Sequence, residues 1–278
     1  MNIPEQLRIA AESFQVEILD LIVKGGQKDV AVVRRGADHH VLKVVTPNGP
    51  SADDTRARAY REVAALAAVL GCENVVELTG EAVELANPPK SVAWMERFVP
   101  GSDLADHLAD LWGWDDAIEM GIEVAKGIAG FHENGIVHRD LSPNNVRVTS
   151  NGGFVVLDPG LGRHIDLETL TGNHLVVGTL GSMSPEHVGL VTRPTPASDV
   201  YCVGLLLFRC LSGESATPIG ADLLGYVENL RRQRRTPITR LRADAPAGAA
   251  ALIDRLLHRQ AARRPKDGRE LQRLLEDL

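Results

Sequence analysis

This sequence has few cysteines, no excess of positive charge and no long apolar run, and these absences exclude several classes of protein. Its three cysteines, Cys72, Cys202 and Cys210, form no CxxC pair, so we expect inert thiols rather than a disulfide framework or a thiolate zinc site. Its formal net charge is -7 and its pI is about 5.7, whereas nucleic-acid binders usually carry a positive surface. No apolar run approaches the ~20 residues of a membrane-spanning helix, and the N-terminus has no signal-peptide pattern. We therefore expect a cytoplasmic protein with no nucleic-acid partner and no membrane segment in this chain.

What the sequence does contain is typical of a globular protein. Hydrophobic residues make up 44% and charged residues 24% of the 278, which is enough apolar material for a sizeable core. In the N-terminal part, short apolar runs end at glycine-containing turns, a pattern that indicates strands. We expect three strands within Val16–Val45, a long helix over Ser51–Leu70, and two more strands over 75–85 and 90–98.

The pattern changes near Pro100. Beyond this residue most apolar side chains recur at helical spacing, and only one short strand pair interrupts them. The expected elements are helices over 104–111 and 114–135, a strand pair over 146–157, and helices from Ala197 onward. The sequence therefore predicts a β-rich part followed by a helical part.

The helical part contains the motif HRDLSPNN at His138–Asn145. This motif resembles the catalytic loop of eukaryotic-type Ser/Thr protein kinases, a family with bacterial members, and the resemblance extends from about Val16 to Leu278. In that family the loop places a base beside the substrate hydroxyl and an amide oxygen on magnesium. The resemblance assigns these two roles to Asp140 and Asn145, which keep the family's spacing.

The resemblance also implies a fold. It is the α+β, bilobal protein-kinase fold, in which one catalytic domain is divided into two lobes. The small β-rich N-lobe with one long helix would be residues 1–99, and the larger, mainly helical C-lobe would be residues 100–278. Ligands favour clefts between such lobes, so the nucleotide is expected there.

Three further residues stand where the family binds metal and phosphate. Asp158, in LDPG, takes the place of the magnesium-binding aspartate, and a carboxylate is the hard ligand that magnesium needs. Lys43, in VLKVV, resembles the lysine that holds the α- and β-phosphates, and Glu62 resembles its acidic partner. Alone each signal is weak, since Asp-Pro-Gly is a common turn and a strand lysine is often simply solvated. With the catalytic loop they predict ATP and Mg²⁺, or Mn²⁺, as cofactors.

Matches downstream favour a protein kinase over a small-molecule phosphotransferase. GTLGSMSPE, which ends at Glu186, resembles the segment that cradles the protein substrate. DVYCVG begins with Asp199, the acid that in the family holds the backbone of the catalytic loop. Arg264, in ARRP, matches the arginine that pairs with the acid corresponding to Glu186.

The phosphate-covering loop departs from the family pattern. Where three glycines are usual, GGQKDV keeps only Gly25 and Gly26, and Lys28 stands near the place of an outer glycine. Backbone amides can still approach phosphates at two glycines, and Lys28 adds positive charge. The alternative is a hairpin turn without nucleotide contact.

Two departures lie near the transferring phosphate. Ser142 replaces a lysine that supports this group, and the loss of one such donor typically costs about 100- to 1,000-fold in rate. Pro159 replaces the phenylalanine of the family's DFG, and its fixed φ should restrict flipping of Asp158. Slow catalysis is the expected result, or else a substitute cation, for which Arg163 and Lys28 are the nearest candidates.

The resemblance also implies an adenine site. Val30 and Val41 are expected against the base, Met95 is expected to guard the back pocket, and Val99 is expected to contact adenine through its backbone. Arg147 stands where an apolar residue usually forms the floor. Its methylene stem can pack there with the guanidinium turned to water.

Regulation by loop phosphorylation is expected from Arg139, since an arginine before the catalytic aspartate marks the subclass ordered by a phosphothreonine. Thr169 and Thr171 are the best candidate sites, with an unmodified hydroxyl as the alternative. Self-association would allow phosphorylation in trans.

Three functions remain open. The favoured one is a Ser/Thr kinase that transfers the γ-phosphoryl group of ATP to a hydroxyl of a protein substrate. The alternatives are a pseudokinase that acts as a nucleotide-binding or scaffold module, and a small-molecule phosphotransferase. The altered residues around ATP favour the pseudokinase, and the survival of the lysine, the acids and the asparagine opposes it.

Overall fold

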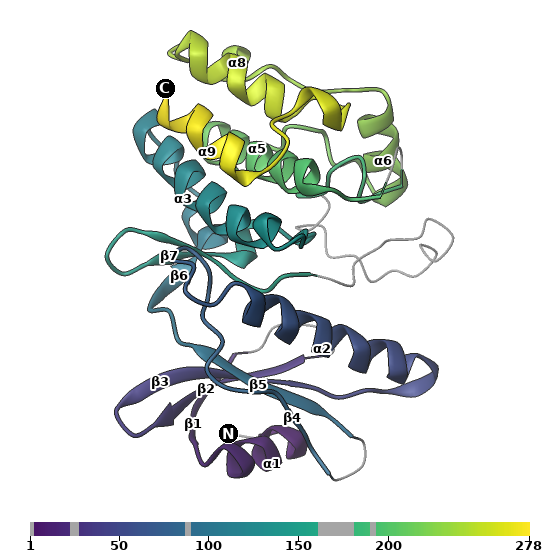
Figure 1. Cartoon of the computed structure of the whole chain (residues 1–278). Helices are drawn as coiled ribbons and strands as arrows, with labels where there is room; N and C mark the ends of the chain where they lie inside the picture. The colour runs from purple at the N-terminus through teal and green to yellow at the C-terminus, as the bar shows by residue number, and fades with distance from the viewer. Residues whose placement is uncertain (1–2, 23–27, 87–89, 161–180, 190–192) are drawn as a thin grey trace. The chain divides into compact units, whose positions relative to one another are not determined.

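The computed structural model describes residues 3–22, 28–86, 90–160, 181–189 and 193–278 (Figure 1). The chain forms two compact units. One, the N-terminal unit, comprises Met1–Gly71 and Val76–Pro100, and the other, the C-terminal unit, comprises Cys72–Val75 and Gly101–Leu278. A β-rich unit with a long helix is thus followed by a mainly helical one, and the predicted fold class is confirmed.

The N-terminal unit is built on one antiparallel sheet of five strands in the order β1-β2-β3-β5-β4. Sequential pairing of β1, β2 and β3 follows from short turns between runs of apolar residues. The strands are β1 (Glu17–Ile22), β2 (Lys28–Arg35), β3 (Asp38–Val45), β4 (Val83–Glu84) and β5 (Val92–Arg97).

Helices cover both faces of this sheet. The short 3-10 turn η1 (Gly49–Ser51) leads into the long helix α2 (Ala52–Ala68), which lies on one face, and α1 (Glu5–Phe14) lies on the other (Figure 1). Because strand residues alternate between faces, Leu42 and Val44 of β3 pack into the cluster beneath α1, whereas Lys43 points to the face of α2. The register of β3 therefore decides which side chains are available to the site.

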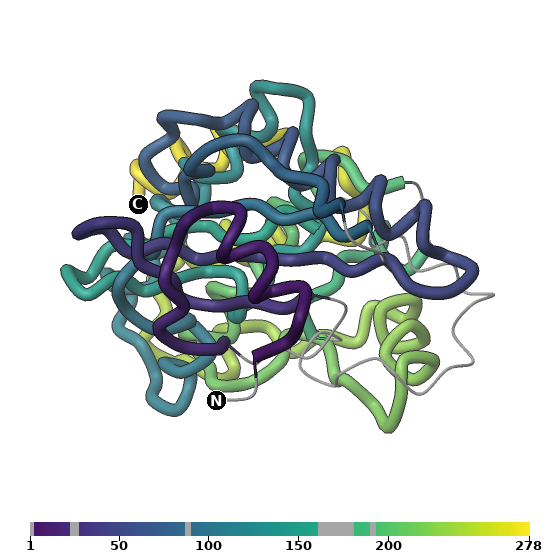
Figure 2. The backbone as a smooth tube through the Cα atoms, turned by 90° about the horizontal axis from the view of Figure 1, so that it is seen from below, coloured from purple at the N-terminus to yellow at the C-terminus, as the bar shows by residue number. Residues whose placement is uncertain are grey.

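Helix α1 was not predicted. It lies across the strands (Figure 2) and buries Leu7, Ala10 and Ala11 against Ala31, Val33 and the other apolar residues of that face. Its apolar positions recur at i, i+3, i+4 and i+7, which is the signature of an amphipathic helix. The signal was present in the sequence and was overlooked because no motif marks this segment.

Two predicted elements are shorter in the structure. The strand expected over 75–85 is reduced to β4 and to isolated bridges at Val75 and Leu78. The helix expected over 104–111 is only the 3-10 turn η2 (Leu104–His107). Short apolar runs are ambiguous in sequence, and here the surrounding packing decides their conformation.

The C-terminal unit contains a three-stranded sheet, β6-β7-β8, and a bundle in which α3 contacts α5 and α9. The catalytic loop and the turn η3 (Pro143–Asn145) lie between α3 and β7 in the chain. The elements are β6 (Gly101–Asp103), β7 (Val146–Thr149), β8 (Phe154–Val156), α3 (Trp114–Glu133), α5 (Pro196–Ser212), α6 (Leu223–Arg231), α7 (Ile238–Leu241), α8 (Ala247–Leu256), η5 (Ala261–Arg263) and α9 (Gly268–Glu276).

Helix α5 is the central element of this unit. It begins with Pro196 at its first turn and a capping box from Thr195, and nearly all its residues are buried. Its Cys202 and Cys210 are free thiols, and burial raises the pKa of Cys210 to about 12, as expected for inert cysteines. Within the described part of the chain, no helix is both long enough and apolar enough to cross a membrane.

Candidate active site

The catalytic loop of the C-terminal unit is held by one buried carboxylate. Asp199, at the start of α5, accepts hydrogen bonds from the backbone N–H groups of His138 at 2.7 Å and Arg139 at 3.0 Å. Its Oδ2 also lies 2.9 Å from Nε2 of His132. Asp199 is fully buried, so each of these donors offsets the cost of removing the carboxylate from water. The role that the sequence assigned to Asp199 is confirmed.

The electrostatics of Asp199 fit this role. Burial alone would raise the pKa of the carboxyl, but the hydrogen bond and charge of His132 and the backbone bond from Arg139 lower the pKa below its usual range. Arg139 has φ of 65°, a left-handed conformation that is uncommon outside glycine. The bonds to Asp199 hold the backbone in this conformation, which is a form of strain found at functional sites.

Asp140 and Asn145 meet inside this loop. The Asn145 Nδ2 group donates to the backbone oxygen of Asp140 at 2.8 Å and to its carboxylate Oδ2 at 2.9 Å. Both amide hydrogens are thus used, which leaves the side-chain oxygen of Asn145 as the acceptor for another group. The structure brings the predicted base and the predicted magnesium ligand together.

The segment after β8 closes against the loop. The backbone N–H of Gly160 donates to the oxygen of His138 at 2.8 Å, and His138 Nε2 lies 2.8 Å from the oxygen of Leu157. A Cβ added to Gly160 would lie 2.2 Å from the Cβ of Asp140, so only glycine fits here. The glycine of LDPG therefore permits close packing against Asp140.

Asp158, in the same segment, has the left-handed φ of 43°. Strain at a non-glycine residue is again located beside the catalytic loop. The carboxylate of Asp158 and the amide oxygen of Asn145 are hard oxygen ligands, and a set of this chemistry fits magnesium. These two residues are the ones that would hold the metal.

In the N-terminal unit, Lys43 is bound by an acid that the sequence did not indicate. Its Nζ donates to both carboxylate oxygens of Glu96, each at 2.7 Å. Trp94 Nε1 also donates to Glu96, at 2.9 Å. Lys43 is 4% exposed and Glu96 is 2% exposed, so the ion pair is shielded from water.

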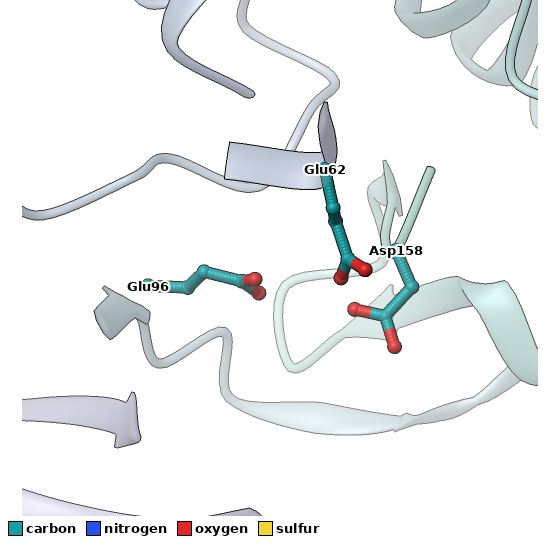
Figure 3. A group of neighbouring side chains, drawn as sticks. All are labelled: Glu62, Glu96 and Asp158. Atoms are coloured by element: carbon teal, nitrogen blue, oxygen red, sulfur yellow. The ribbon is translucent and has the colours of Figure 1, made fainter. Parts of the chain in front are cut away.

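A second ion pair lies beside the first. Lys28 Nζ donates to Oε1 of Glu62 at 2.5 Å and lies 5.5 Å from the ring centroid of Trp94, within the range of a cation–π contact. Carboxylate oxygens of Glu62 and Glu96 lie within 4.8 Å of each other, and Figure 3 shows the two side chains reaching from α2 and β5. The expected pairing of Lys43 with Glu62 stays a prediction, while Lys28 is an observed partner of Glu62.

The register of β5 changes the place of Met95. Met95 lies opposite Leu42 and packs into the apolar cluster beneath α1, away from the face of Lys43. Trp94 lies opposite Lys43, and Glu96 follows two residues later on the same face. The expectation that Met95 guards the back pocket stays a prediction, and Glu96 is the residue that lies on the face of Lys43. The alternation of side chains along β5 could have identified Glu96, but only if the register of β5 against β3 were known.

The other residues expected near adenine are placed as follows. Val30 lies directly opposite Lys43 in the β2–β3 pair, and Val41 is two residues before Lys43, so both side chains share its face. Val99 follows the end of β5 and is half-buried. Contact of these three with a nucleotide stays a prediction.

Arg147 does not extend into water as expected. Its Nη1 donates to Oδ1 of Asp103 at 2.8 Å, and the two side chains are only 18% and 20% exposed. The physical reason is strand pairing, since Asp103 on β6 lies directly opposite Arg147 on β7. Asp103 was not singled out from the sequence, where it is far from Arg147.

Glu186 and Arg264 form the predicted ion pair. Both guanidinium Nη atoms donate to the carboxylate, each at 3.0 Å, and both side chains are fully buried. Arg264 also donates to the oxygen of Ala197 and stacks over the ring of Tyr201 at 4.6 Å. This forked pair ties the segment that ends at Glu186 to α5 and to the C-terminal region.

Comparison with known proteins identifies the family that this geometry suggests. Residues 22–275 match the model of the protein kinase domain. The chain belongs to the protein kinase family. The bacterial Ser/Thr protein kinases that it is similar to include the probable serine/threonine-protein kinase PkwA of Thermomonospora curvata, which is 32% identical over 208 residues.

Other relatives give the same result. The probable kinase PknB of Lactococcus lactis is 30% identical over 203 residues, and a Ser/Thr kinase of Corynebacterium efficiens, drp72, is 31% identical over 183 residues. These alignments cover 73%, 70% and 63% of this chain for PkwA, PknB and drp72, but only 26%, 31% and 33% of the relatives. The chain therefore matches about a quarter to a third of the length of these relatives.

Some residues that matter in this family lie outside the described part of the chain. They are Gly25 and Gly26 of the phosphate-covering loop and the threonines Thr169 and Thr171. Arg139 is described, and its buried Nε bonds no acceptor among the described residues. The roles predicted for all five in nucleotide binding and regulation stay predictions.

Proposed function

We propose that this kinase domain transfers the γ-phosphoryl group of ATP to a Ser or Thr hydroxyl of a protein. The observation that carries the proposal is the arrangement around Asp140. Asn145 donates one bond to the carboxylate of Asp140 and one to its backbone oxygen. Gly160 packs against Asp140, and Asp199 accepts bonds from the backbone of the loop. Phosphoryl transfer depends mainly on positioning and on charge compensation, and such a rigid loop supplies the positioning.

Each residue has a role in this reaction. Asp140 accepts the proton of the substrate hydroxyl as its oxygen bonds to the γ-phosphorus and ADP departs. Asn145 and Asp158 hold Mg²⁺ through oxygen atoms. When bound, the metal neutralises charge on the phosphate oxygens. Lys43 binds the α- and β-phosphates, and Lys28 adds a second cation on the same face of the sheet.

The segment that ends at Glu186 supports the proposal that the substrate is a protein. The buried bond between Glu186 and Arg264 fixes the end of the segment that in protein kinases cradles the substrate. A small-molecule phosphotransferase has less support for this reason. The proposal also includes autophosphorylation on Thr169 or Thr171, in which one copy of the chain phosphorylates another. The phosphothreonine would then pair with Arg139.

A second candidate function is favoured by specific observations. Lys43 is bound to Glu96, and Arg147 is bound to Asp103, so two cations near the expected nucleotide residues already have anionic partners within the protein. Such internal neutralisation suits a pseudokinase that acts as a scaffold or binds nucleotide weakly. The intact set of Asp140, Asn145 and Asp158 opposes this reading.

Transfer of labelled γ-phosphate to a generic protein substrate, with Mg²⁺ or Mn²⁺, separates the two candidates. Asp140→Asn should lower the rate by about 100- to 10,000-fold, because it removes the base and keeps the shape of the side chain. Asp110→Asn is the matched control, since Asp110 is an exposed acid of the same unit, and it should behave as the unmodified chain. Equal phosphate incorporation by all three proteins would refute the proposed function.

A further inference from the structure

Two ion pairs lie on the α2 face of the N-terminal sheet. We call Lys28, Lys43, Glu62 and Glu96, together with Trp94, the charge cluster. Lys43 is paired with Glu96 and Lys28 with Glu62, so two cations face two anions. A triphosphate carries several negative charges and needs net positive charge from the site that binds it. A phosphate that binds Lys43 must therefore compete with the carboxylate of Glu96.

Glu96 engages Lys43 directly. It accepts two charge-assisted bonds of 2.7 Å from the ammonium group, and a bond from the indole of Trp94 fixes its orientation. Trp94 is fully buried, and Glu96 is 2% exposed, so the pair lies in a medium where charges interact strongly. The carboxylate of Glu96 therefore binds the ammonium group of Lys43 in the way that phosphate oxygens would.

We propose that Glu96 is an internal competitor of nucleotide phosphates for Lys43 and thereby sets the affinity of this domain for ATP and ADP. The inference rests on the proposed function in one respect, the assignment of Lys43 to the phosphates. Nucleotide binding requires Lys43 to exchange the carboxylate of Glu96 for phosphate oxygens. Lys28 remains on Glu62 during this exchange and keeps the neighbouring acid neutralised.

The competition makes a directional prediction. Removing the negative charge of Glu96 removes a carboxylate that accepts two bonds from Lys43, so phosphate-bearing ligands should bind more tightly. A hydrogen bond to a charged group contributes about 1.5–3 kcal/mol, which corresponds to about a 10- to 100-fold change in Kd. Adenosine lacks phosphates, so its Kd should change by less than about threefold if the competition acts only through charge.

Titration calorimetry with Mg·ADP and with adenosine tests this inference. Glu96→Gln keeps the shape of the side chain and removes its charge, and its Kd for Mg·ADP should fall by about 10- to 100-fold. Glu96→Asp keeps the negative charge but shortens the side chain, so its carboxylate lies farther from Lys43. Its affinity for Mg·ADP should therefore rise by less than that of Glu96→Gln. Glu77→Gln is the matched control, because Glu77 is an exposed acid of the same unit that bonds Arg97.

Unchanged or weaker binding of Mg·ADP by both Glu96 variants would overturn the inference. An equal gain for adenosine would also overturn it, because Glu96 would then obstruct the base and not the phosphates. Addition of Lys43→Met to Glu96→Gln should abolish the gain for Mg·ADP, and its persistence would show that another cation is involved.

The inference and the proposed function can fail separately. If Glu96→Gln tightens Mg·ADP binding but no variant transfers phosphate, the competition is supported and the catalytic proposal fails. If the unmodified chain transfers phosphate and Glu96→Gln leaves the Kd for Mg·ADP unchanged, the catalytic proposal is supported and the competition fails.

Discussion

The catalytic loop of the C-terminal unit and the charge cluster of the N-terminal unit use their charged residues differently. In the loop, Asp199 bonds the backbone and Asn145 bonds Asp140, so that Asp140 is oriented by hydrogen bonds. In the cluster, each charged side chain has an opposite charge as its partner. Under the proposed function the first arrangement prepares Asp140 for chemistry, and under the further inference the second withholds Lys43 from its ligand.

This difference indicates where the domain departs from its family. The residues that position the base follow the family pattern, and the departures concern the groups that meet the nucleotide. Each unexpected charge has acquired a partner, Glu96 with Lys43 and Arg147 with Asp103. Buried charges need such partners, since an isolated one is costly. The residues to which catalysis is assigned are retained, while two charged groups near the expected nucleotide residues have partners within the protein.

The largest effect on stability is expected where the C-terminal unit buries a full ion pair. Arg264→Met leaves the carboxylate of Glu186 buried without its partner, and the free energy of unfolding should fall by about 3–5 kcal/mol in urea titrations. Arg255→Met, in the exposed pair with Glu270, is the matched control and should cost about 0–1 kcal/mol. Similar losses in both variants would show that the buried pair does not set the stability of this unit.

The close packing of Gly160 on Asp140 predicts a large effect of substitution on the rate of phosphate transfer. In Gly160→Ala the new methyl group would displace Asp140, and a shift of about 1 Å can cost about 100-fold in rate. The rate of phosphate transfer should fall accordingly, while adenosine binding stays unchanged. Gly225→Ala, where an added Cβ meets Asp222 at an ordinary 3.4 Å, should leave the rate unaltered, and equal rates in both variants would contradict the packing argument.

A smaller effect is expected from His187, whose ring is buried beside the ion pair. Burial lowers the pKa of His187. The positive charges of Arg139 and Arg264 lower this pKa further, whereas the negative charges of Asp199 and Glu186 oppose the shift. The unfolded chain then binds a proton more readily, so the unfolding free energy should decline as pH falls below about 6.5, by at most about 1.4 kcal/mol per pH unit.

His187→Asn should flatten this decline in urea titrations between about pH 7 and about pH 5. The asparagine oxygen can replace Nδ1 as the acceptor for the backbone N–H of Ser184. A decline as steep in His187→Asn as in the unmodified chain would assign the pH dependence to other groups.

The catalytic loop could be predicted from the sequence because its roles lie within one continuous motif. Asp140 and Asn145 are close in the chain, so their contact follows from local geometry, and Asp199 was placed by a second motif. The main strands and the helices α2 and α3 were likewise indicated by periodicity. Helix α1 could have been found by the same reasoning.

The charge cluster could not be predicted in this way. The bond between Lys43 and Glu96 depends on which face of β5 each residue occupies, and a shift of one residue exchanges Met95 for Glu96. The bond between Arg147 and Asp103 likewise depends on the pairing of β6 with β7. Contacts of this kind are set by tertiary register, which a single sequence specifies weakly.

The most direct test of this account is the rate of γ-phosphate transfer at limiting Mg·ATP for three proteins measured side by side. The account predicts that Glu96→Gln is fastest, the unmodified chain is slower and Asp140→Asn is at background. The first variant removes a carboxylate that competes for Lys43, and the last removes the base. Transfer by Asp140→Asn equal to that of the unmodified chain, with no gain in Glu96→Gln, would contradict both the catalytic role of the loop and the inhibitory role of the charge cluster.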